Sequence, residues 1–394
     1  MAFYFCLLVV TTPAGALPDS CNFYRDYNLI YAPQYDLLNS AVNLNSAGKL
    51  LYDAWFRALA PKVKNGVLRT GISTAWIFLT RWSALLFPHE FGHWLRARQV
   101  GGDFGFERFA FPGIIGWMKL PESAPLESHI LALIGGLEVD DLTAELIAQE
   151  FYHRQGLYND EFGLVFGHRL MYPLYALLTL PANPQNPDYW ENVGGDPATF
   201  VKLIWERNSR PVLMPDSSVN PQLLKLHYGT IILSILINLA DINFYHSAGA
   251  FFGPELGGRP ARFLLGDEQN GWAYSTLFNP SPLGPEVYLF NYFRLKGRFY
   301  TTSLRFSFPL YGFGAGIRAP EFFTAGRLML GFGADVWHQR FYGTGAGLSV
   351  ELGLRLGHNW QLLLSAGGKT RGYLPGRPVG AGFAGYAGVK YIMP

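Results

Sequence analysis

The C-terminal part of the chain alternates apolar and polar residues, and this alternation constrains the fold more than any other feature. In Gly345–Leu356 apolar residues occupy every second position, with glycine, serine, glutamate and arginine between them. Because successive side chains of a strand point to opposite faces, such a segment has one apolar and one polar wall. Arg327–Val336, Gly297–Phe308 and Ala381–Tyr391 repeat the pattern. It predicts about eight antiparallel strands of about ten residues between Pro285 and Tyr391.

One apolar and one polar wall fit two kinds of sheet. In a soluble β-sandwich the apolar wall faces the core, whereas in an outer-membrane barrel it faces lipid and the polar wall lines a narrow interior. Strands of about ten residues and aromatic residues at strand ends favour the barrel. These aromatic residues are Trp337, Phe341, Tyr342, Trp360 and Tyr373. We therefore predict an antiparallel β-barrel at the outer membrane of a bacterium, with membrane lipid as a partner.

From about Leu37 to Ala240 the apolar residues follow a helical period instead. Four long apolar helices are expected, over residues 71–97, 126–151, 162–180 and 221–240. Residues 182–220 are rich in proline, asparagine and aspartate, which predicts surface loops around one short helix. The expected fold is therefore α+β and multidomain, with a helical domain over residues 17–240 and the β-barrel over residues 241–394.

The N-terminus and the composition both indicate a chain that is exported to a membrane. Residues 2–10 are apolar and precede Ala14-Gly15-Ala16, which is typical of a signal peptide over residues 1–16. Charged residues make up 15% of the chain and aromatic residues 16%, a composition typical of a membrane-associated protein. The net charge of +2, without a basic run, predicts that nucleic acid is not a partner.

Residues 89–93, His-Glu-Phe-Gly-His, form an HExxH motif at the end of an apolar segment. Histidines at positions i and i+4 lie one turn apart on one helix face, so His89 and His93 are placed to bind one Zn²⁺. Glu90 would take a proton from an activated water and pass it to the leaving amine. Isolated polar side chains would be costly in so apolar a helix, which favours a metal site. Gly92 leaves room for a neighbouring element to approach closely.

The segment HEFGHWLRARQVGG resembles the first motif of site-2-type intramembrane metalloproteases, in which an HExxH helix ends in a basic segment and a glycine turn. The next apolar segment, HILALIGGLEVDDLTAELIA, is similar to the small-residue helix that follows in that family. The resemblance covers about Gly71 to Leu146, and it implies a zinc-dependent endopeptidase at a membrane. The nearest match to a later family motif, which contains an aspartate, is Asn238-Leu239-Ala240-Asp241.

The sequence leaves the third zinc ligand open between Glu138 and Asp241. An acidic stripe at positions i, i+3 and i+7 lies on an otherwise apolar helix: Glu138, Asp141 and Glu145. A gluzincin-like peptidase takes its third ligand as a glutamate from the next packed helix, and Gly135-Gly136 would let this helix come close, which favours Glu138. Asp141 would then orient a ligand histidine. His129 is a further candidate, and a helix face turned to water is the alternative interpretation of the stripe.

These features together predict a membrane-associated zinc metallopeptidase that hydrolyses peptide bonds in a protein or peptide substrate. Its metal ligands would be His89, His93 and Glu138, and its general base Glu90. The alternative from another class is an outer-membrane β-barrel scaffold or channel with a helical plug and a non-catalytic metal site. A soluble secreted protease with a β-sandwich is a third hypothesis.

Overall fold

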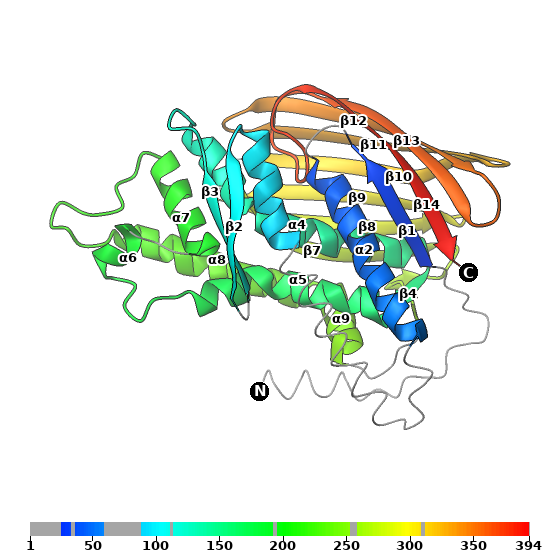
Figure 1. Ribbon diagram of the computed structural model, residues 1–394, viewed down its shortest axis with the longest axis horizontal. Coiled ribbons are helices and arrows are strands. Elements are labelled where there is room, and N and C mark those ends of the chain that lie inside the picture. Colours follow the sequence, from blue (N-terminus) through cyan, green and yellow to red (C-terminus); the bar gives the residue numbers. More distant parts are fainter. Residues whose placement is uncertain are drawn as a thin grey trace.

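The helical period of the N-terminal part produces a set of packed helices (Figure 1). The structure is a computed structural model that describes residues 25–32, 36–58, 88–110, 113–191, 195–252, 258–308 and 312–393. Residues 88–99 are helical, and the other helices are α2 (Leu37–Ala58), α4 (Leu126–His153), α5 (Asn159–Leu178), α6 (Pro187–Glu191), α7 (Asp196–Arg207), α8 (Pro221–Ala240) and α9 (Ile242–Phe252). The predicted signal peptide at residues 1–16 and most of the helix predicted over residues 71–97 lie outside the described residues.

Helix α8 begins and ends where the sequence predicts. Pro221 lies in its first turn, where a missing N–H removes no helical hydrogen bond, and the Asn220 side chain accepts a hydrogen bond from Gln222 N at 3.0 Å. Among the described helices, α8 alone is long and apolar enough to cross a bilayer. Length and composition are the only grounds for that statement, since core helices meet the same criterion.

The alternating segments form a single antiparallel sheet of ten strands in the order β1-β14-β13-β12-β11-β10-β9-β8-β7-β6. The bounds of its strands are β1 (Arg25–Tyr31), β6 (Leu265–Gly266), β7 (Gly271–Ser281), β8 (Gly284–Leu295), β9 (Arg298–Ser307), β10 (Gly312–Ala325), β11 (Leu328–Gln339), β12 (Gly343–Arg355), β13 (Trp360–Lys369) and β14 (Gly382–Met393). Two small two-stranded sheets pair β2 (Asp103–Ala110) with β3 (Gly113–Lys119), and β4 (Gly156–Tyr158) with β5 (Gly258–Pro260).

Strands β6 to β14 follow one another in sequence order, so the sheet is a meander to which only β1 is added from the N-terminal part. The tightest connection joins β8 to β9 through Lys296 and Gly297. Both residues have positive φ angles, 51° and 76°, which is the geometry of a type I′ hairpin turn. The register then pairs Leu295 with Arg298 and fixes which residues of the two strands share a face.

The prediction of a closed barrel is wrong, because helices take the place of the strand pairing that would close the sheet. At one edge, side chains of α2 bind the backbone of β1: Ser46 accepts from Asn28 N at 2.8 Å, and Asn43 accepts from Ile30 N at 2.7 Å. At the other edge, Thr276 of β7 donates to Ile237 O of α8 at 2.8 Å. Side chains of α2 therefore bind the backbone of the β1 edge, and a side chain of β7 binds the backbone of α8, without a closed ladder.

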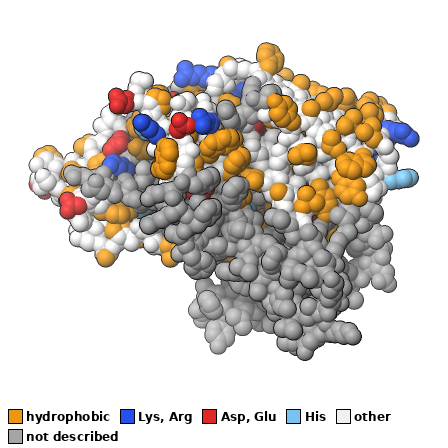
Figure 2. All heavy atoms as spheres, viewed as in Figure 1, with side chains coloured by type: hydrophobic (Ala, Val, Ile, Leu, Met, Phe, Trp, Pro, Cys, Tyr) orange, Lys and Arg blue, Asp and Glu red, His pale blue; other side chains and the backbone are white. Residues whose placement is uncertain are grey.

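The apolar wall of the sheet faces outward and the polar wall faces the helices. Figure 2 shows hydrophobic side chains gathered over the part of the surface formed by the sheet. Leu348 is 68% exposed and Phe383 is 87% exposed. Other exposed apolar residues of this face are Leu304, Phe306, Phe313, Val336, Val350, Leu362 and Leu364. Within the described part of the chain no second sheet covers this wall, as a β-sandwich would require.

The helices and the sheet share hydrophobic clusters across the boundary predicted at residues 240 and 241. One cluster joins Ala144 and Ile147 of α4 to Ala273, Tyr292 and Phe299 of strands β7 to β9. Figure 1 shows the sheet curving over α2 and α4, with β1 beside β14. The described helical part and the sheet are therefore packed as one unit, with α4 at its centre.

Candidate metal centre

His89 and His93 share one face of helical residues 88–99, one turn apart, as the motif predicts. Their Nε2 atoms are 3.3 Å apart. Both face Oδ2 of Asp196, which lies 3.1 Å from Nε2 of His89 and 3.0 Å from Nε2 of His93. The two histidines are buried, with exposed fractions of 5% and 6%. The three side chains form a group whose ligand atoms converge on one point and which is able to hold a metal ion.

Asp196 reaches the histidines because it is the first residue of α7. Gly195 has a φ of 91°, a conformation that glycine adopts without strain, and it turns the chain into the helix. The backbone N–H of Asp196 donates to the Tyr175 hydroxyl of α5 at 3.4 Å, which ties the start of α7 to α5. Residues 182–220, predicted as loops around one short helix, thus contain two helices, α6 and α7, and one member of the metal group.

Glycines let α4 pass directly beneath the two histidines. A Cβ atom on Gly92 would overlap the carbonyl of Gly135, so the two helices cross in backbone contact. A Cβ atom on Gly136 would lie 2.6 Å from Nε2 of His93 and 2.7 Å from Nε2 of His89. The close approach expected of Gly92 and of Gly135-Gly136 is therefore confirmed, and it holds α4 against the imidazoles.

The second nitrogen of each ring is also bound, which orients both Nε2 atoms toward Asp196. His89 Nδ1 donates to Asp140 Oδ2 at 2.8 Å, and His93 Nδ1 donates to Ala132 O at 3.0 Å. Asp140 in turn accepts a hydrogen bond from His168 Nδ1 of α5 at 2.9 Å. Contacts of this kind fix the tautomer and orientation of metal-binding histidines. The residue that orients a histidine is thus Asp140, not Asp141 as predicted.

The carboxylates around the rings favour positive charge at this position. Burial disfavours the charged form of His89, but Asp140 and Asp196 outweigh burial and hold the pKa of His89 well above its usual value. Asp196 likewise raises the pKa of His93 in spite of burial. Burial acts to raise the pKa of Asp196, but His93 and His89 hold it below its usual range. The group therefore stabilises positive charge, which a metal cation would supply.

Glu90 lies at the side of the metal group that faces the β2–β3 hairpin. Its Oε2 lies 3.0 Å from the position that a Cβ atom on Gly116 of β3 would occupy. The ring of Phe104 of β2 stacks on the ring of His93, with centroids 6.2 Å apart. Burial raises the pKa of Glu90, while His93 and His89 act to lower it. The hairpin thus covers Glu90 and the histidines, and Figure 1 shows it in front of α4 and α5.

Glu138, predicted as the third ligand, is not brought to the histidines but binds Arg96. Arg96 Nε donates to Glu138 Oε2 at 2.7 Å, and Arg96 Nη2 donates to the other carboxylate oxygen. That oxygen also accepts hydrogen bonds from the Tyr373 hydroxyl at 3.0 Å and from Gly376 N at 2.8 Å. The prediction is therefore corrected: Asp196 is the carboxylate at the histidines, because every bond to Glu138 named here ties it to Arg96 and to the segment after β13.

The alternative ligands are also placed elsewhere. Asp241 is buried 3.3 Å from Arg169 Nη2 and accepts a hydrogen bond from Ser275 of β7 at 3.3 Å. His129, near the start of α4, does not belong to the metal group.

The sequence does contain a local signal near Asp196: a proline that follows an aspartate, as in Asp196-Pro197, marks a helix start. That local signal predicts α7 but not its approach to a helix a hundred residues away.

Comparisons of the chain with protein-family models, with curated proteins and with solved structures found no match. What the site can do must therefore be judged from its geometry. Two imidazole nitrogens and one carboxylate oxygen are donors that zinc accepts, and three protein ligands leave a coordination position open. A second carboxylate, Glu90, lies next to this group.

Proposed function

We propose that this protein is a membrane-associated zinc metallopeptidase in which His89, His93 and Asp196 hold the metal and Glu90 is the general base. The observation that carries the proposal is the convergence of three ligand atoms from two separate segments beside a fourth residue that is able to accept a proton. Two histidines, one acid and an open position constitute a typical catalytic zinc site. The resemblance to site-2-type metalloproteases is part of this proposal, with Asp196 in the role expected of Glu138 or Asp241.

In the proposed reaction, a bound zinc ion supplies a Lewis acid that activates water at neutral pH. The Glu90 carboxylate accepts a proton from this water as it attacks the peptide carbonyl, and then donates that proton to the departing amine. Asp140 and the Ala132 carbonyl keep the two histidine rings in one orientation during the reaction. The β2–β3 hairpin limits access of bulk water to Glu90.

The membrane association is supported by the outward apolar wall of the sheet. A soluble protein rarely exposes so large a set of apolar side chains on one face, and a polar inner wall is typical of outer-membrane strands. We place this wall against lipid in the outer membrane of a bacterium. Extraction of cell membranes with carbonate tests the placement: the protein should stay with the membranes, and its release into the soluble fraction would contradict it.

Catalysis is tested by replacing Glu90→Gln, with Glu122→Gln at an exposed position as the matched control. We expect hydrolysis of a fluorogenic peptide to fall at least about 100-fold in Glu90→Gln, with bound zinc unchanged, because a general base contributes about 100-fold to 10,000-fold. Unchanged hydrolysis in a zinc-loaded Glu90→Gln protein would refute the role of Glu90. A wild-type protein that holds zinc and cleaves nothing would favour the alternative, a membrane scaffold with a non-catalytic metal.

A further inference from the structure

A second polar site lies on the other side of α4. A cavity of about 340 Å³ separates the polar wall of the sheet from helices α2 and α4. Helix α4 lines it with residues such as Leu142, Glu145 and Gln149, whereas Ala132 and Asp140 on the opposite side of the same helix contact the histidines. No residue of the metal group lines the cavity. Its volume falls in the range of small-ligand sites, about 300–1,000 Å³.

The cavity exists because glycines alternate with polar residues across the inner wall of the sheet. Residues directly opposite one another in paired strands share a face. Two such rows cross strands β9 to β13: Ser303–Gly316–Asp335–Gly347–Lys369 and Thr301–Arg318–Gly333–Ser349–Gly367. A Cβ atom on Gly316 would lie 2.5 Å from Asp335 Oδ1 and 2.7 Å from Ser303 Oγ, so these side chains lie over the glycine. A filled barrel interior would carry bulky side chains at such positions.

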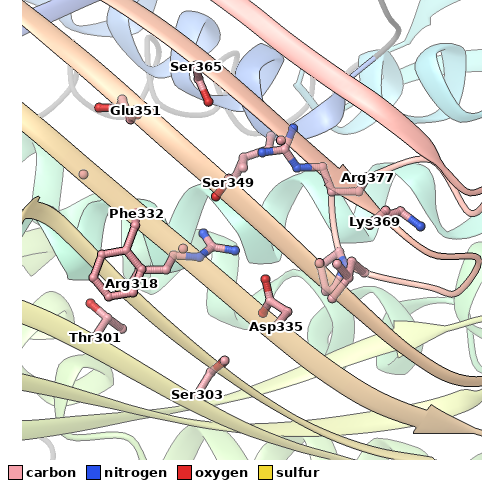
Figure 3. A pocket seen from close by; sticks show the side chains of 18 of the residues that line it. Thr301, Ser303, Arg318, Phe332, Asp335, Ser349, Glu351, Ser365, Lys369 and Arg377 are labelled. Atoms are coloured by element: carbon pink, nitrogen blue, oxygen red, sulfur yellow. The ribbon is translucent and has the colours of Figure 1, made fainter.

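Three charged residues that line this cavity, Arg305, Arg318 and Asp335, form no ion pair among the described residues. Arg305 is 5% exposed, its Nη1 donates to Tyr373 O at 2.9 Å, and its Nη2 has no acceptor among the described residues. Arg318 and Asp335 carry opposite charges on neighbouring strands (Figure 3), yet within the described ranges neither of them forms an ion pair or a side-chain hydrogen bond. Arg318 is exposed and Asp335 is half-buried, so only Arg305 is a buried donor here. Leaving its Nη2 without an acceptor costs about 1–3 kcal/mol, so a ligand that supplies the acceptor is favoured.

We propose that the cavity binds a short peptide with a free amino end and a free carboxyl end. Its carboxylate fits the guanidinium group of Arg305, whose Nη2 lacks an acceptor, since arginine binds carboxylates through charge-assisted hydrogen bonds. Its ammonium group fits Asp335. The hydroxyl groups of Ser303 and Ser349, which Figure 3 shows around Asp335 and Arg318, lie where they can bond to peptide groups between the two ends. A ligand with both charges matches a cavity that presents both Arg305 and Asp335.

The test measures binding of trialanine by calorimetry. The protein is the full-length, zinc-loaded Glu90→Gln variant in detergent, which should not hydrolyse the peptide. N-acetyl-trialanine, trialanine amide and inorganic phosphate are the comparison probes. We expect each blocked peptide to bind at least about tenfold more weakly, which corresponds to about 1.4 kcal/mol for each lost charge contact. Phosphate binding as tightly as trialanine would overturn the proposal in favour of a simple anion site.

Two variants assign the binding to this cavity. Asp335→Asn should weaken trialanine at least about tenfold and leave N-acetyl-trialanine unchanged. It keeps the shape of the side chain and removes no ion pair or side-chain hydrogen bond among the described residues, so the fold should persist. Gly316→Ala should weaken both, because its methyl group displaces Asp335 and Ser303. Gly380→Ala, where nothing lies within 4 Å of the added methyl group, is the control. Equal affinity in all variants, or no binding of any probe by folded protein, would overturn the proposal and leave a water-filled space.

Discussion

The backbone of Gly92 lies directly against the backbone of Gly135, with no room for a Cβ atom on either residue. This contact sets the distance between helical residues 88–99 and α4. Every feature of the metal group that involves α4 depends on that distance, including the hydrogen bonds from the histidines to Asp140 and Ala132.

Replacing Gly92→Ala should therefore separate the two helices. We expect a loss of about 1–3 kcal/mol in the free energy of unfolding, the usual cost of overpacking, together with weaker zinc binding. Gly229→Ala on α8 is the matched control, because nothing lies within 4 Å of its added methyl group and alanine favours a helix by up to about 1 kcal/mol. Chemical denaturation in detergent measures the free energy of unfolding of both variants. Equal stability of the two variants would mean that the helices do not cross in contact.

Asp140 accepts hydrogen bonds from His89 and from His168, so it acts on the metal through the orientation of His89. Asp140→Asn should reduce zinc affinity about 10-fold to 100-fold, the range known for residues that orient metal ligands. Competition with a chelating indicator measures the affinity, and Asp216→Asn at an exposed loop position is the control. Identical zinc affinity in the Asp140 variant and the control would contradict this role.

The Arg96–Glu138 pair is fully buried and contributes to the fold instead of the metal group. Glu138→Gln leaves a buried arginine without its counter-charge, which typically costs about 3–5 kcal/mol. We expect the free energy of unfolding to fall by that amount relative to the exposed Glu122→Gln variant. A loss below about 1 kcal/mol would show that the pair is dispensable.

The crossing of Gly92 and Gly135 also explains how far the sequence could predict the site. The motif and the glycines correctly predicted two histidines close to α4, and Glu138 does lie against the same helix. It lies opposite Arg96, however, three residues beyond His93, where a carboxylate meets a guanidinium group. Asp196 could not be found in this way, because its approach to the histidines depends on tertiary packing of α7 that no local pattern encodes.

The sheet shows the same division between local and long-range information. Alternation predicted the strand at Gly345–Leu356, and β12 spans Gly343–Arg355. It also correctly separated an apolar from a polar wall. Closure was predicted wrongly because β1, at residues 25–31, lies in the part assigned to the helical domain, and because Asn43 and Ser46 of α2 satisfy its free edge. Side-chain capping of a strand by a helix leaves no periodic signal.

Stability should depend on pH through Glu145, which accepts a hydrogen bond from the Tyr292 hydroxyl at 2.8 Å. Burial raises its pKa from 4.5 to about 7, although Arg169 opposes the shift. Below pH 4.5 Glu145 is protonated in both the folded and the unfolded chain, so its shifted pKa does not lower the free energy of unfolding. Between pH 4.5 and 7 the unfolded chain releases this proton before the folded chain does, so stability falls as pH rises, by up to about 3 kcal/mol.

The variant Glu145→Gln removes this dependence. We expect its free energy of unfolding, relative to wild type, to increase from pH 4.5 to pH 7 and then to level off, as measured by denaturation at fixed pH steps. Parallel pH profiles for the two proteins would show that Glu145 does not retain its proton in the folded state.

The most direct test of the metal group is the zinc content of three purified proteins after removal of all metal and addition of one equivalent of zinc: wild type, Asp196→Asn and Glu138→Gln. We expect about one zinc ion per chain in the wild type and in folded Glu138→Gln, and loss of tight zinc binding in Asp196→Asn. Full zinc binding by Asp196→Asn together with its loss from folded Glu138→Gln would contradict the assignment of Asp196 as the third ligand.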